Sequence, residues 1–507
     1  MKLTLETNGN VEINMYYLQT LCMNFWPGVK FGAAYESDED EPSVKFVISE
    51  RDGGIDARVT ITDRTKMTSV IRHVNFSEEH TLTSTAKIAA GNAMLDAGQQ
   101  YMHYAPSWGI MTGVRPSKVA SDYLHRGYSP AKTRAALRTE YSLYPKKAAL
   151  VTDIALLEDK IASPYFKGWC SLYISIPFCP SRCIYCSFVS YTSKKLLSLI
   201  PLYVEILSSE IKEKIELIKR LGLKIATVYI GGGTPTILTE EQLSQVLHAV
   251  YDNYDVSTLR EYTLEAGRPD TITGEKLRIA KRLGVTRISV NTQTINDKVL
   301  ESIGRNHTAE DFYRAFETAV NSGIYCINTD LIAGLPGESF VSFSKSFDKV
   351  IEMHPENITV HTFSVKKAAE ILRHGSSVYS RVNKDAGKSV DYSQIGAKSS
   401  GYRPYYIYRQ KNTVGNYENV GFSLDGYEGL YNIFMMEEIH SVFAAGAGAV
   451  TRLVSERENG ADMTVPVRIE RLFNPKYPYE YLKETDPEKR AELARKDESR
   501  IMEFYEK

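Results

Sequence analysis

The stretch that decides the fold is Tyr173-Ile-Ser-Ile-Pro-Phe-Cys179-Pro-Ser-Arg-Cys183-Ile-Tyr-Cys186-Ser-Phe188. The apolar run Leu172–Ile176 predicts a buried strand that ends at Pro177. Three cysteines follow on one loop, with the spacing C-x3-C-x2-C. Thiolate sulfur is a soft ligand that suits iron–sulfur clusters and zinc. Three thiolates can hold three irons of a [4Fe–4S] cluster and leave the fourth iron open, whereas a closed zinc site needs a fourth protein ligand.

The other three cysteines do not supply that fourth ligand. Cys170 stands at the far end of the predicted strand, about 20 Å or more from Cys179 at about 3.3 Å per residue. Cys22 falls in an amphipathic helix and Cys326 in a second apolar run. We expect all three to be small buried hydrophobic residues, as free cysteine usually is. Half of a zinc ribbon is the alternative for the triplet, but no second Cys/His pair stands at ribbon spacing.

Bulk composition indicates an ordinary soluble protein. The 507 residues are 43% hydrophobic and 24% charged, with a net charge of −1. No basic excess points to nucleic acid or to an anionic membrane. The N-terminus alternates polar and apolar residues unlike a signal peptide, and no apolar run approaches membrane-spanning length. Six cysteines in a chain of this length do not suggest a disulfide framework, so we expect a cytoplasmic protein. We also expect a monomer.

The chain divides into three predicted parts: an N-terminal accessory α+β domain at 1–165, a strand–helix repeat at 166–400 and a C-terminal domain at 401–507. In the first part we expect strands at Leu3–Glu6 and Glu12–Asn14 and a helix at Tyr16–Phe25. Ser43–Ile48 and Ile55–Thr62 flank Gly53-Gly54 and predict a hairpin. An alanine-rich helix should span Thr81–Ala97. In the last part we expect an aromatic strand at Tyr402–Gln410 and a helix at Met435–Phe443.

The middle part alternates strictly between strands and helices. Strands are expected at Leu172–Ile176, Thr227–Ile230, Tyr262–Ala266, Arg287–Asn291, Tyr325–Leu331 and Asn357–Thr362. Helices are expected at Leu196–Leu221, Glu240–Tyr254, Gly274–Leu283, Ala309–Asn321 and Phe340–Met353. Strand–helix–strand repeats require a parallel sheet. Six such units predict an α/β fold with a partial (β/α)6 barrel.

Polar features stand where five of these strands end. They are the cysteine loop, Gly231-Gly-Gly-Thr-Pro235, Glu265, Gln293 and Asp330. Active sites of parallel α/β barrels lie at the C-terminal strand ends. One such glutamate is usually an ordinary solvated group, but five features at one rim indicate a site. Three successive glycines also let the backbone approach a ligand closely, although many glycine-rich turns are only tight turns.

The cysteine loop resembles that of the radical SAM superfamily, with Tyr185 as the aromatic residue before the last cysteine. The resemblance becomes narrower through five motifs that recur in order: Gly231-Gly-Gly-Thr-Pro235, Glu265-Ala-Gly-Arg-Pro269, Ser289-Val-Asn-Thr-Gln293, Ile303-Gly-Arg-Asn-His307 and Asp330-Leu-Ile-Ala-Gly-Leu-Pro-Gly337. Together they resemble the oxygen-independent coproporphyrinogen III oxidase family. Gly113-Val-Arg-Pro116 and Tyr405-Tyr-Ile-Tyr-Arg-Gln-Lys-Asn412 are similar to its coproporphyrinogen dehydrogenase subgroup.

The resemblance implies a set of site residues. Cys179, Cys183 and Cys186 would ligate a [4Fe–4S] cluster whose open iron binds S-adenosylmethionine. Tyr173, Gly232 and Glu265 would contact that cofactor. A second S-adenosylmethionine, as in the family's oxidase, would contact Tyr185, Gly233, Thr234, Gln293, Arg305 and Asp330. The chain departs from that oxidase at Phe188, where a fourth cysteine would stand, and at Ser175, where a histidine would stand.

The implied activity is the oxidative decarboxylation of coproporphyrinogen III to protoporphyrinogen IX. A flavodoxin or ferredoxin would deliver the electron, and a radical formed from S-adenosylmethionine would take hydrogen from a propionate. Arg268, Lys366, Lys367 and Arg373 are candidate partners of the substrate's propionates, or solvated surface charges. Two alternatives stay open: a heme-binding chaperone, whose C-terminal H-N-x-x-Y-W motif is missing here, and radical opening of heme. His307, His361 and His440 are expected to be structural rather than heme ligands.

Overall fold

The computed structural model describes residues 2–32, 41–186, 190–364, 384–410, 413–458, 461, 466–483 and 487–506. Contacts group them into two compact units. The first holds residues 2–155 together with 409–416, and the second holds the described residues of 156–364, 384–408 and 417–506. In the described part of the chain, no helix combines the length and the apolar character needed to cross a membrane. The division into three domains remains a prediction.

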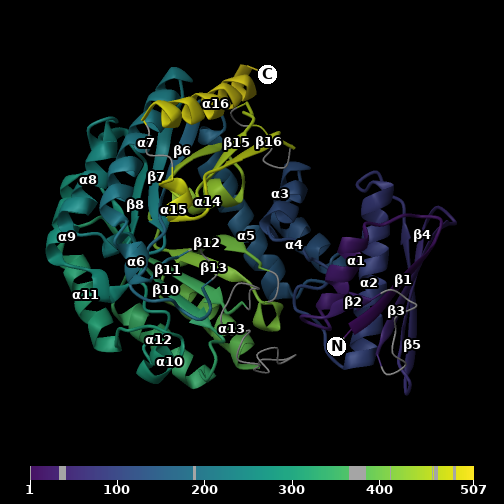
Figure 1. The fold of residues 1–507 in the computed structure, drawn as a ribbon. Helices are drawn as coiled ribbons and strands as arrows, with labels where there is room; N and C mark the ends of the chain where they lie inside the picture. The colour runs from purple at the N-terminus through teal and green to yellow at the C-terminus, as the bar shows by residue number, and fades with distance from the viewer. Residues whose placement is uncertain are drawn as a thin grey trace. The chain divides into compact units, whose positions relative to one another are not determined.

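The first unit contains a mixed sheet with α1 and α2 on one face (Figure 1). Its strand order is β2-β1-β3-β4-β5, and α2 packs on β4 and β5. The strands are β1 (Lys2–Gly9), β2 (Lys30–Gly32), β3 (Ser43–Arg51), β4 (Gly54–Thr62) and β5 (Met67–Asn75). The helices are α1 (Met15–Met23), α2 (Leu82–Met102), α3 (Ser117–His125) and α4 (Pro130–Thr139), and α5 (Pro145–Ala162) leads into the second unit.

Most predictions for the first unit are confirmed, but one predicted strand is wrong and the strands β2 and β5 were not predicted. The hairpin at Gly53-Gly54 forms, with Gly54 paired to Arg51 across the turn. The strand expected at Glu12–Asn14 is wrong, because the Asn14 side chain accepts a hydrogen bond from the Tyr16 amide and caps α1 instead. Strand β5 was not predicted, because it lies largely exposed and carries no clean apolar alternation.

The second unit is an 11-stranded sheet in the order β12-β13-β11-β10-β9-β8-β7-β6-β14-β15-β16. The six central strands are parallel. They are β6 (Trp169–Ile176), β7 (Lys224–Gly232), β8 (Glu261–Glu265), β9 (Arg287–Ser289), β10 (Cys326–Ala333) and β11 (Asn357–Thr362). Strand β13 pairs with β11 and strand β14 pairs with β6, at the two sides of this group. The six parallel strands, each followed along the chain by one or more helices, are the partial barrel that the sequence predicts.

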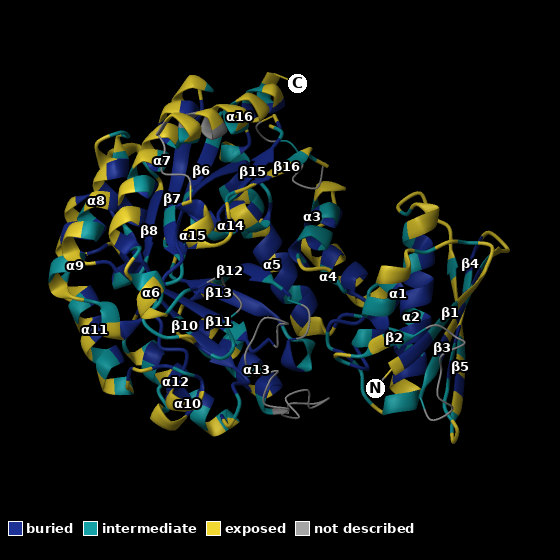
Figure 2. Ribbon diagram, viewed as in Figure 1, coloured by how far each residue is buried: buried dark blue, intermediate teal, exposed yellow. Residues whose placement is uncertain are grey.

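Helices cover the outer face of the parallel strands. They are α6 (Lys194–Leu197), α7 (Ile200–Arg220), α8 (Glu240–Tyr251), α9 (Gly274–Arg282), α10 (Asp297–Ser302), α11 (Ala309–Asn321) and α12 (Phe340–Glu352). Figure 2 shows their outward sides exposed and the strands beneath them buried. The helix predicted at Leu196–Leu221 is interrupted after Leu197, and the short α10 was not predicted.

The C-terminal segment completes the sheet on both flanks. It adds α13 (Lys384–Ser399), β12 (Arg403–Tyr408), β13 (Asn419–Ser423), α14 (Leu430–Met436), β14 (Ser441–Ala445), β15 (Val450–Val454), β16 (Ile469–Phe473), α15 (Pro478–Tyr481) and α16 (Pro487–Glu506). The helix predicted at Met435–Phe443 is wrong. Ser441–Ala445 is instead a fully buried strand parallel to β6, and periodicity cannot tell a short buried strand from a helix.

Candidate active site

The C-terminal ends of the parallel strands bring the predicted features to one edge of the sheet. Ile176, just before the cysteine loop, pairs with Gly232 of the glycine run. Glu265 at the end of β8 pairs with Ser289, and Asp330 pairs with Thr359 further along the sheet. The register of the sheet therefore places the cysteine loop, the glycine run, Glu265 and Asp330 along one rim, as the sequence predicts.

The cysteine loop is fixed by backbone contacts with the turn after α10. The Ile184 amide donates to the Ile303 carbonyl over 3.1 Å, and the Ser181 hydroxyl donates to the Gly304 carbonyl over 3.0 Å. Gly304 has φ +79°, and a Cβ there would lie 2.8 Å from the Arg182 carbonyl oxygen. Glycine is required at this turn by both its backbone angle and the close approach of the loop.

The three cysteines of the loop share one electrostatic environment. Cys183 is buried, and Cys179 and Cys186 are partly buried. Burial raises the pKa of Cys179 to about 11, the hydroxyl of Thr234 at 3.3 Å lowers it, and the neighbouring Cys186 and Cys183 raise it. Among the described residues, no group of three or more His, Cys, Asp or Glu side chains is arranged to bind a single metal ion. A [4Fe–4S] cluster presents separate irons, so its thiolates need not converge on one point.

The remaining cysteines are core residues, which confirms the sequence interpretation. Cys22, Cys170 and Cys326 are buried. Burial raises the pKa of Cys326 to about 12, and it raises the pKa of Cys22 and Cys170 further. A thiol held in its neutral form is a poor metal ligand, because the thiolate is the ligating species. These three cysteines are therefore unsuited to join the loop as ligands.

The glycine run packs directly on the cysteine loop. The Gly233 amide donates to the Ile176 carbonyl over 2.7 Å, and the Thr234 amide donates to the Phe178 carbonyl over 2.7 Å. A Cβ at Gly233 would lie 2.5 Å from the Phe178 carbonyl oxygen, and Gly232 has φ +106°. The glycines therefore allow the backbone to approach the loop next to Cys179, a packing requirement that the sequence analysis did not separate from ligand binding.

Glu265 lies in an aromatic environment that the sequence did not reveal. Tyr173, Tyr229 and Tyr431 stack on one another, with the rings of Tyr229 and Tyr431 4.4 Å apart between centroids. The Tyr229 hydroxyl donates a short hydrogen bond to the Glu265 carboxylate. Burial raises the pKa of Glu265 to about 7, although the Tyr229 hydrogen bond lowers it. Glu265 is thus a partly buried carboxylate whose pKa lies near neutral pH. Tyr431 comes from the C-terminal segment, and only the fold brings it here.

Asp330 is held in its ionised form by polar neighbours. Asn328 Nδ2 donates to its carboxylate over 2.8 Å, and His361 Nε2 lies 3.6 Å away. Burial alone would raise the pKa of Asp330, but the interactions with His361, Asn328 and Thr359 lower it. Asp330 therefore keeps a negative charge, as a residue that binds a cation or hydroxyl groups requires. His361 also contacts the Tyr408 hydroxyl, which agrees with a structural role.

Gln293 is a strained and incompletely bonded residue at the rim. Its φ is +71°, and its side chain is 5% exposed. No hydrogen-bond partner reaches its Oε1 in the described residues. Backbone hydrogen bonds to Asp330 and Ile332 hold it between β9 and β10. Strain and an unpaired buried polar atom both concentrate at functional sites, because the ligand or the chemistry compensates for them.

Arg305 joins the cysteine loop to the ends of β8 and β9. Its Nη1 donates to the carbonyls of Gly267 and Asn291 over 3.0 and 2.9 Å. Its Nε and Nη2 lie 3.4 and 3.3 Å from the hydroxyl of Tyr185, the aromatic residue before Cys186. Arg305 is 8% exposed, so the guanidinium is a buried cation beside the cysteines.

Ser175, which stands where the resemblance expects histidine, binds the turn after β14. Its hydroxyl donates to the Ala447 carbonyl over 2.9 Å. The Tyr203 hydroxyl donates to the Ser175 carbonyl and accepts from the Ala447 amide, each over 2.8 Å. The small-residue turn at 446–449 therefore supports the strand that carries the cysteine loop.

The remaining residues singled out in the sequence are the candidate propionate-binding cations, Phe188 and two histidines. The guanidinium of Arg268 faces Asp270 and the cysteine loop and is buried. Phe188, Lys366, Lys367 and Arg373 lie outside the described residues. His440 is buried and bonded to Ser171 and to the Tyr165 carbonyl, as a structural histidine would be. His307 is also buried, with both ring nitrogens unpaired among the described residues.

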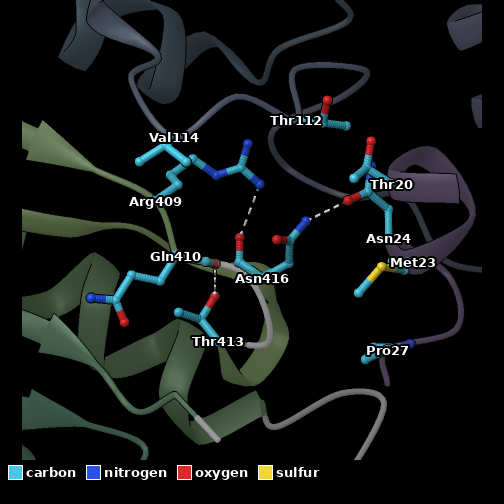
Figure 3. A pocket seen from close by; sticks show the side chains of 10 residues that line it. All are labelled: Thr20, Met23, Asn24, Pro27, Thr112, Val114, Arg409, Gln410, Thr413 and Asn416. Carbon is cyan, nitrogen blue, oxygen red and sulfur yellow. Dashed lines mark hydrogen bonds between the residues drawn. The ribbon is translucent and has the colours of Figure 1, made fainter. Parts of the chain in front are cut away.

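Val114 of the Gly113–Pro116 motif and Arg409 and Gln410 of the Tyr405–Asn412 motif line a small pocket of the first unit (Figure 3). The Arg409 amide donates to the Val114 carbonyl over 2.8 Å, and Asn416 Nδ2 donates to Asn24 Oδ1 over 2.6 Å. The pocket offers about 50 Å³, far below the roughly 300–1,000 Å³ of small-molecule sites. Val114 and Arg409 therefore help to build the first unit, whereas Tyr405–Tyr408 of the second motif lie in β12 of the second unit.

Residues 173–350 match the Radical SAM superfamily profile. The oxygen-independent coproporphyrinogen-III oxidase-like protein HemZ of Bacillus subtilis (strain 168) is 34% identical over 450 residues, covering 87% of this chain and 88% of that protein. The chain belongs to this family of radical SAM proteins. Members of the radical SAM superfamily use a [4Fe–4S] cluster and S-adenosylmethionine, and the loop, the glycine run and the strand ends described above are where the fold would hold them.

Heme chaperones are also relatives of this radical SAM protein. The heme chaperone HemW of Lactococcus lactis subsp. lactis (strain IL1403) is 29% identical over 282 residues, covering 55% of this chain and 68% of that protein. Among solved structures, coproporphyrinogen III oxidase (HemN) from Escherichia coli is 19% identical, with a TM-score of 0.48, and the match covers 65% of this chain and 72% of that one. A likeness at that level carries no information about activity.

Proposed function

We propose that this protein is a radical SAM enzyme that decarboxylates coproporphyrinogen III oxidatively to protoporphyrinogen IX. The proposal rests on one observation above all: the rim of the sheet gathers the cysteine loop, the glycine run, Glu265, Gln293, Arg305 and Asp330. The match to the HemZ protein over nearly all of both chains supports the choice of a coproporphyrinogen oxidase-like activity.

In this proposal Cys179, Cys183 and Cys186 ligate a [4Fe–4S] cluster, and the surrounding residues hold S-adenosylmethionine. When bound, the cluster and S-adenosylmethionine supply one-electron reduction and hydrogen-atom abstraction. Tyr173, Gly232 and Glu265 line the cluster-bound S-adenosylmethionine. Ionised Glu265 would accept a hydrogen bond from the amino group of the bound cofactor, beside the stacked rings of Tyr173 and Tyr229.

A second S-adenosylmethionine would take Tyr185, Gly233, Thr234, Gln293, Arg305 and Asp330. The buried Arg305 suits a carboxylate and the ionised Asp330 suits a cation or ribose hydroxyls. The unpaired Gln293 Oε1 would gain a hydrogen-bond donor from the ligand.

The overall reaction converts each of two propionates into a vinyl group. A propionate loses carbon dioxide, one proton and two electrons, and one of these electrons leaves with the abstracted hydrogen atom. The other passes to an acceptor. A flavodoxin or ferredoxin is the proposed donor of the electron that reduces the cluster.

An anaerobic assay with reductant, S-adenosylmethionine and coproporphyrinogen III tests this function. We expect about four irons per reconstituted chain, 5′-deoxyadenosine and a divinyl product. A Cys183→Ala variant should lose the cluster and the product together. A full cluster in that variant, or zinc as the native metal, would refute the ligand assignment.

A heme chaperone is the second candidate, favoured by the similarity to HemW proteins across the radical SAM segment. The absence of an H-N-x-x-Y-W motif from the sequence argues against it. The same anaerobic assay with heme in place of coproporphyrinogen III separates the two. Tight heme binding, with no 5′-deoxyadenosine formed in the presence of either heme or coproporphyrinogen III, would support the chaperone and exclude the oxidase.

A further inference from the structure

Arg268 is a buried cation directed at the cysteine loop. Its side chain is only 4% exposed. Nη1 donates to the Ser181 hydroxyl over 3.0 Å and lies 3.4 Å from the Ser181 carbonyl oxygen. The same nitrogen lies 3.9 Å from Cys183 Sγ, within reach of a hydrogen bond to sulfur. Arg268 therefore presents one N–H edge to a loop cysteine that faces little solvent.

The other edge of the guanidinium is held by Asp270. Nε and Nη2 donate to the two carboxylate oxygens over 3.1 and 3.2 Å, a bidentate arrangement that fixes the orientation of the fork. The backbone here is fixed as well, because the Thr271 hydroxyl donates to the Arg268 carbonyl over 2.8 Å. Asp270 thus aims Nη1 at the loop and partly offsets the positive charge of Arg268.

Stability alone does not account for this pair. Burying the Arg268 guanidinium costs desolvation that its attraction to the partly exposed Asp270 at most repays, and an apolar side chain often serves as well at a buried position. Arg305 is a second buried cation near Cys183, but its N–H groups are used elsewhere. Arg305 is engaged with Gly267, Asn291 and Tyr185, and burial lowers the pKa of His307 to about 3, so that ring is neutral.

We propose that Arg268 and Asp270 set the reduction potential of the cluster bound at Cys183. The inference rests on the proposed function, which places a cluster ligand at this sulfur. Hydrogen bonds to the sulfurs and local charge tune the potentials of iron–sulfur clusters. One electron from the flavodoxin- or ferredoxin-type donor makes the cluster more negative by one charge, and no bond forms or breaks. The N–H group and positive charge of Arg268 favour that reduced state, and Asp270 opposes it.

The test is the midpoint potential of the reconstituted full-length protein, followed by electron paramagnetic resonance during an anaerobic titration without S-adenosylmethionine. Arg268→Gln keeps much of the side-chain volume and removes the charge. Its equilibrium constant for one-electron reduction should fall at least about tenfold, which corresponds to a potential lower by about 59 mV. Asp270→Asn keeps its shape and removes the opposing charge, so its potential should rise.

Arg278→Gln is the matched control. Arg278 lies on α9, is 70% exposed and pairs with Glu275, so its loss should leave the potential unchanged. Opposite shifts in Arg268→Gln and Asp270→Asn support the proposal, because a general loosening of the site would move both variants in the same direction. Equal potentials in all variants, or shifts of one sign, overturn it.

Iron content separates this proposal from the proposed function. A wild-type chain that takes up no cluster contradicts the proposed function. A chain that holds about four irons with an unmoved potential contradicts only the role of Arg268 and Asp270. If Arg268→Gln does not assemble a cluster, Asp270→Asn decides: a raised potential supports the proposal and an unchanged one overturns it.

Discussion

Glu265 makes cofactor binding depend on pH at the level of a single residue. Its pKa of about 7 means that the carboxylate is lost as pH falls below neutrality. Burial raises this pKa, hydrogen bonds from Tyr229 and the Gly232 amide lower it, the charge of Asp330 raises it, and His361 lowers it. Because an ionised carboxylate accepts a hydrogen bond from the cofactor's amino group far better than a neutral carboxyl does, affinity for S-adenosylmethionine should fall as pH drops from 8 to 6, by up to about tenfold per unit below the pKa.

Calorimetric titration of the reconstituted protein across this pH range measures that effect. Glu265→Gln should bind weakly at every pH. Tyr229→Phe removes the hydrogen bond that lowers the pKa of Glu265, so its transition should move to higher pH. An unaltered pH dependence in Glu265→Gln would show that another group titrates.

Gln293 allows stability and binding to be separated. Glycine adopts the left-handed backbone angle of this position without the cost of about 1 kcal/mol or more that a side chain imposes there. The replacement also removes a buried oxygen that has no partner among the described residues. Gln293→Gly should therefore keep or raise the melting temperature while it weakens binding of S-adenosylmethionine. His103→Gly relieves a similar φ of +54° at the end of α2 and should leave binding unchanged. A large loss of stability in Gln293→Gly with intact binding would contradict the assignment.

At the scale of elements, the turn at Gly304 controls the conformation of the cysteine loop. Gly304→Ala adds a Cβ 2.8 Å from the Arg182 carbonyl at a φ of +79°, so loop and turn must separate. We expect a large loss of bound iron after reconstitution, with a loss of about 1–3 kcal/mol in stability. Gly323→Ala carries a similar φ of +68° with nothing within 4 Å of the new Cβ, so it should keep its iron. Equal iron contents would show that the turn does not fix the loop.

The elements of the parallel sheet could be predicted because each one obeys a local rule. The strand at Asn357–Thr362 and the helix at Ala309–Asn321 have the bounds that the sequence predicts, since apolar periodicity and the Thr308 cap mark them. The rim residues followed from parallel topology. The contacts of Tyr431, Arg268 and Ser175 could not be predicted, because they join segments far apart in sequence. Residues such as Ser441–Ala445 are too short and too uniformly apolar to reveal their pairing with β6.

At the scale of the whole molecule, the proposed cluster site belongs to the second unit. All three loop cysteines and their described contacts with Gly304, Thr234 and Arg268 lie within it. Removing residues 1–144 leaves α5 intact and should spare cluster assembly, with about four irons per chain after reconstitution. The full-length Cys183→Ala variant gives the iron content expected when a ligand is missing. A truncated chain with that low value would show that the first unit is needed for the site.

The pairing of β6 with β14 has a consequence for biosynthesis. The strand that leads into the cysteine loop gains its second neighbour from Ser441–Ala445, about 265 residues later in the chain. At about 5–20 residues per second, the ribosome needs roughly 15 to 50 seconds to synthesise that interval. During this time one side of β6 has no strand to pair with, and the Ser175 hydroxyl has no Ala447 carbonyl to bind. The strand that leads into the cysteine loop therefore reaches its full set of described contacts only after residues 441–447 have been synthesised.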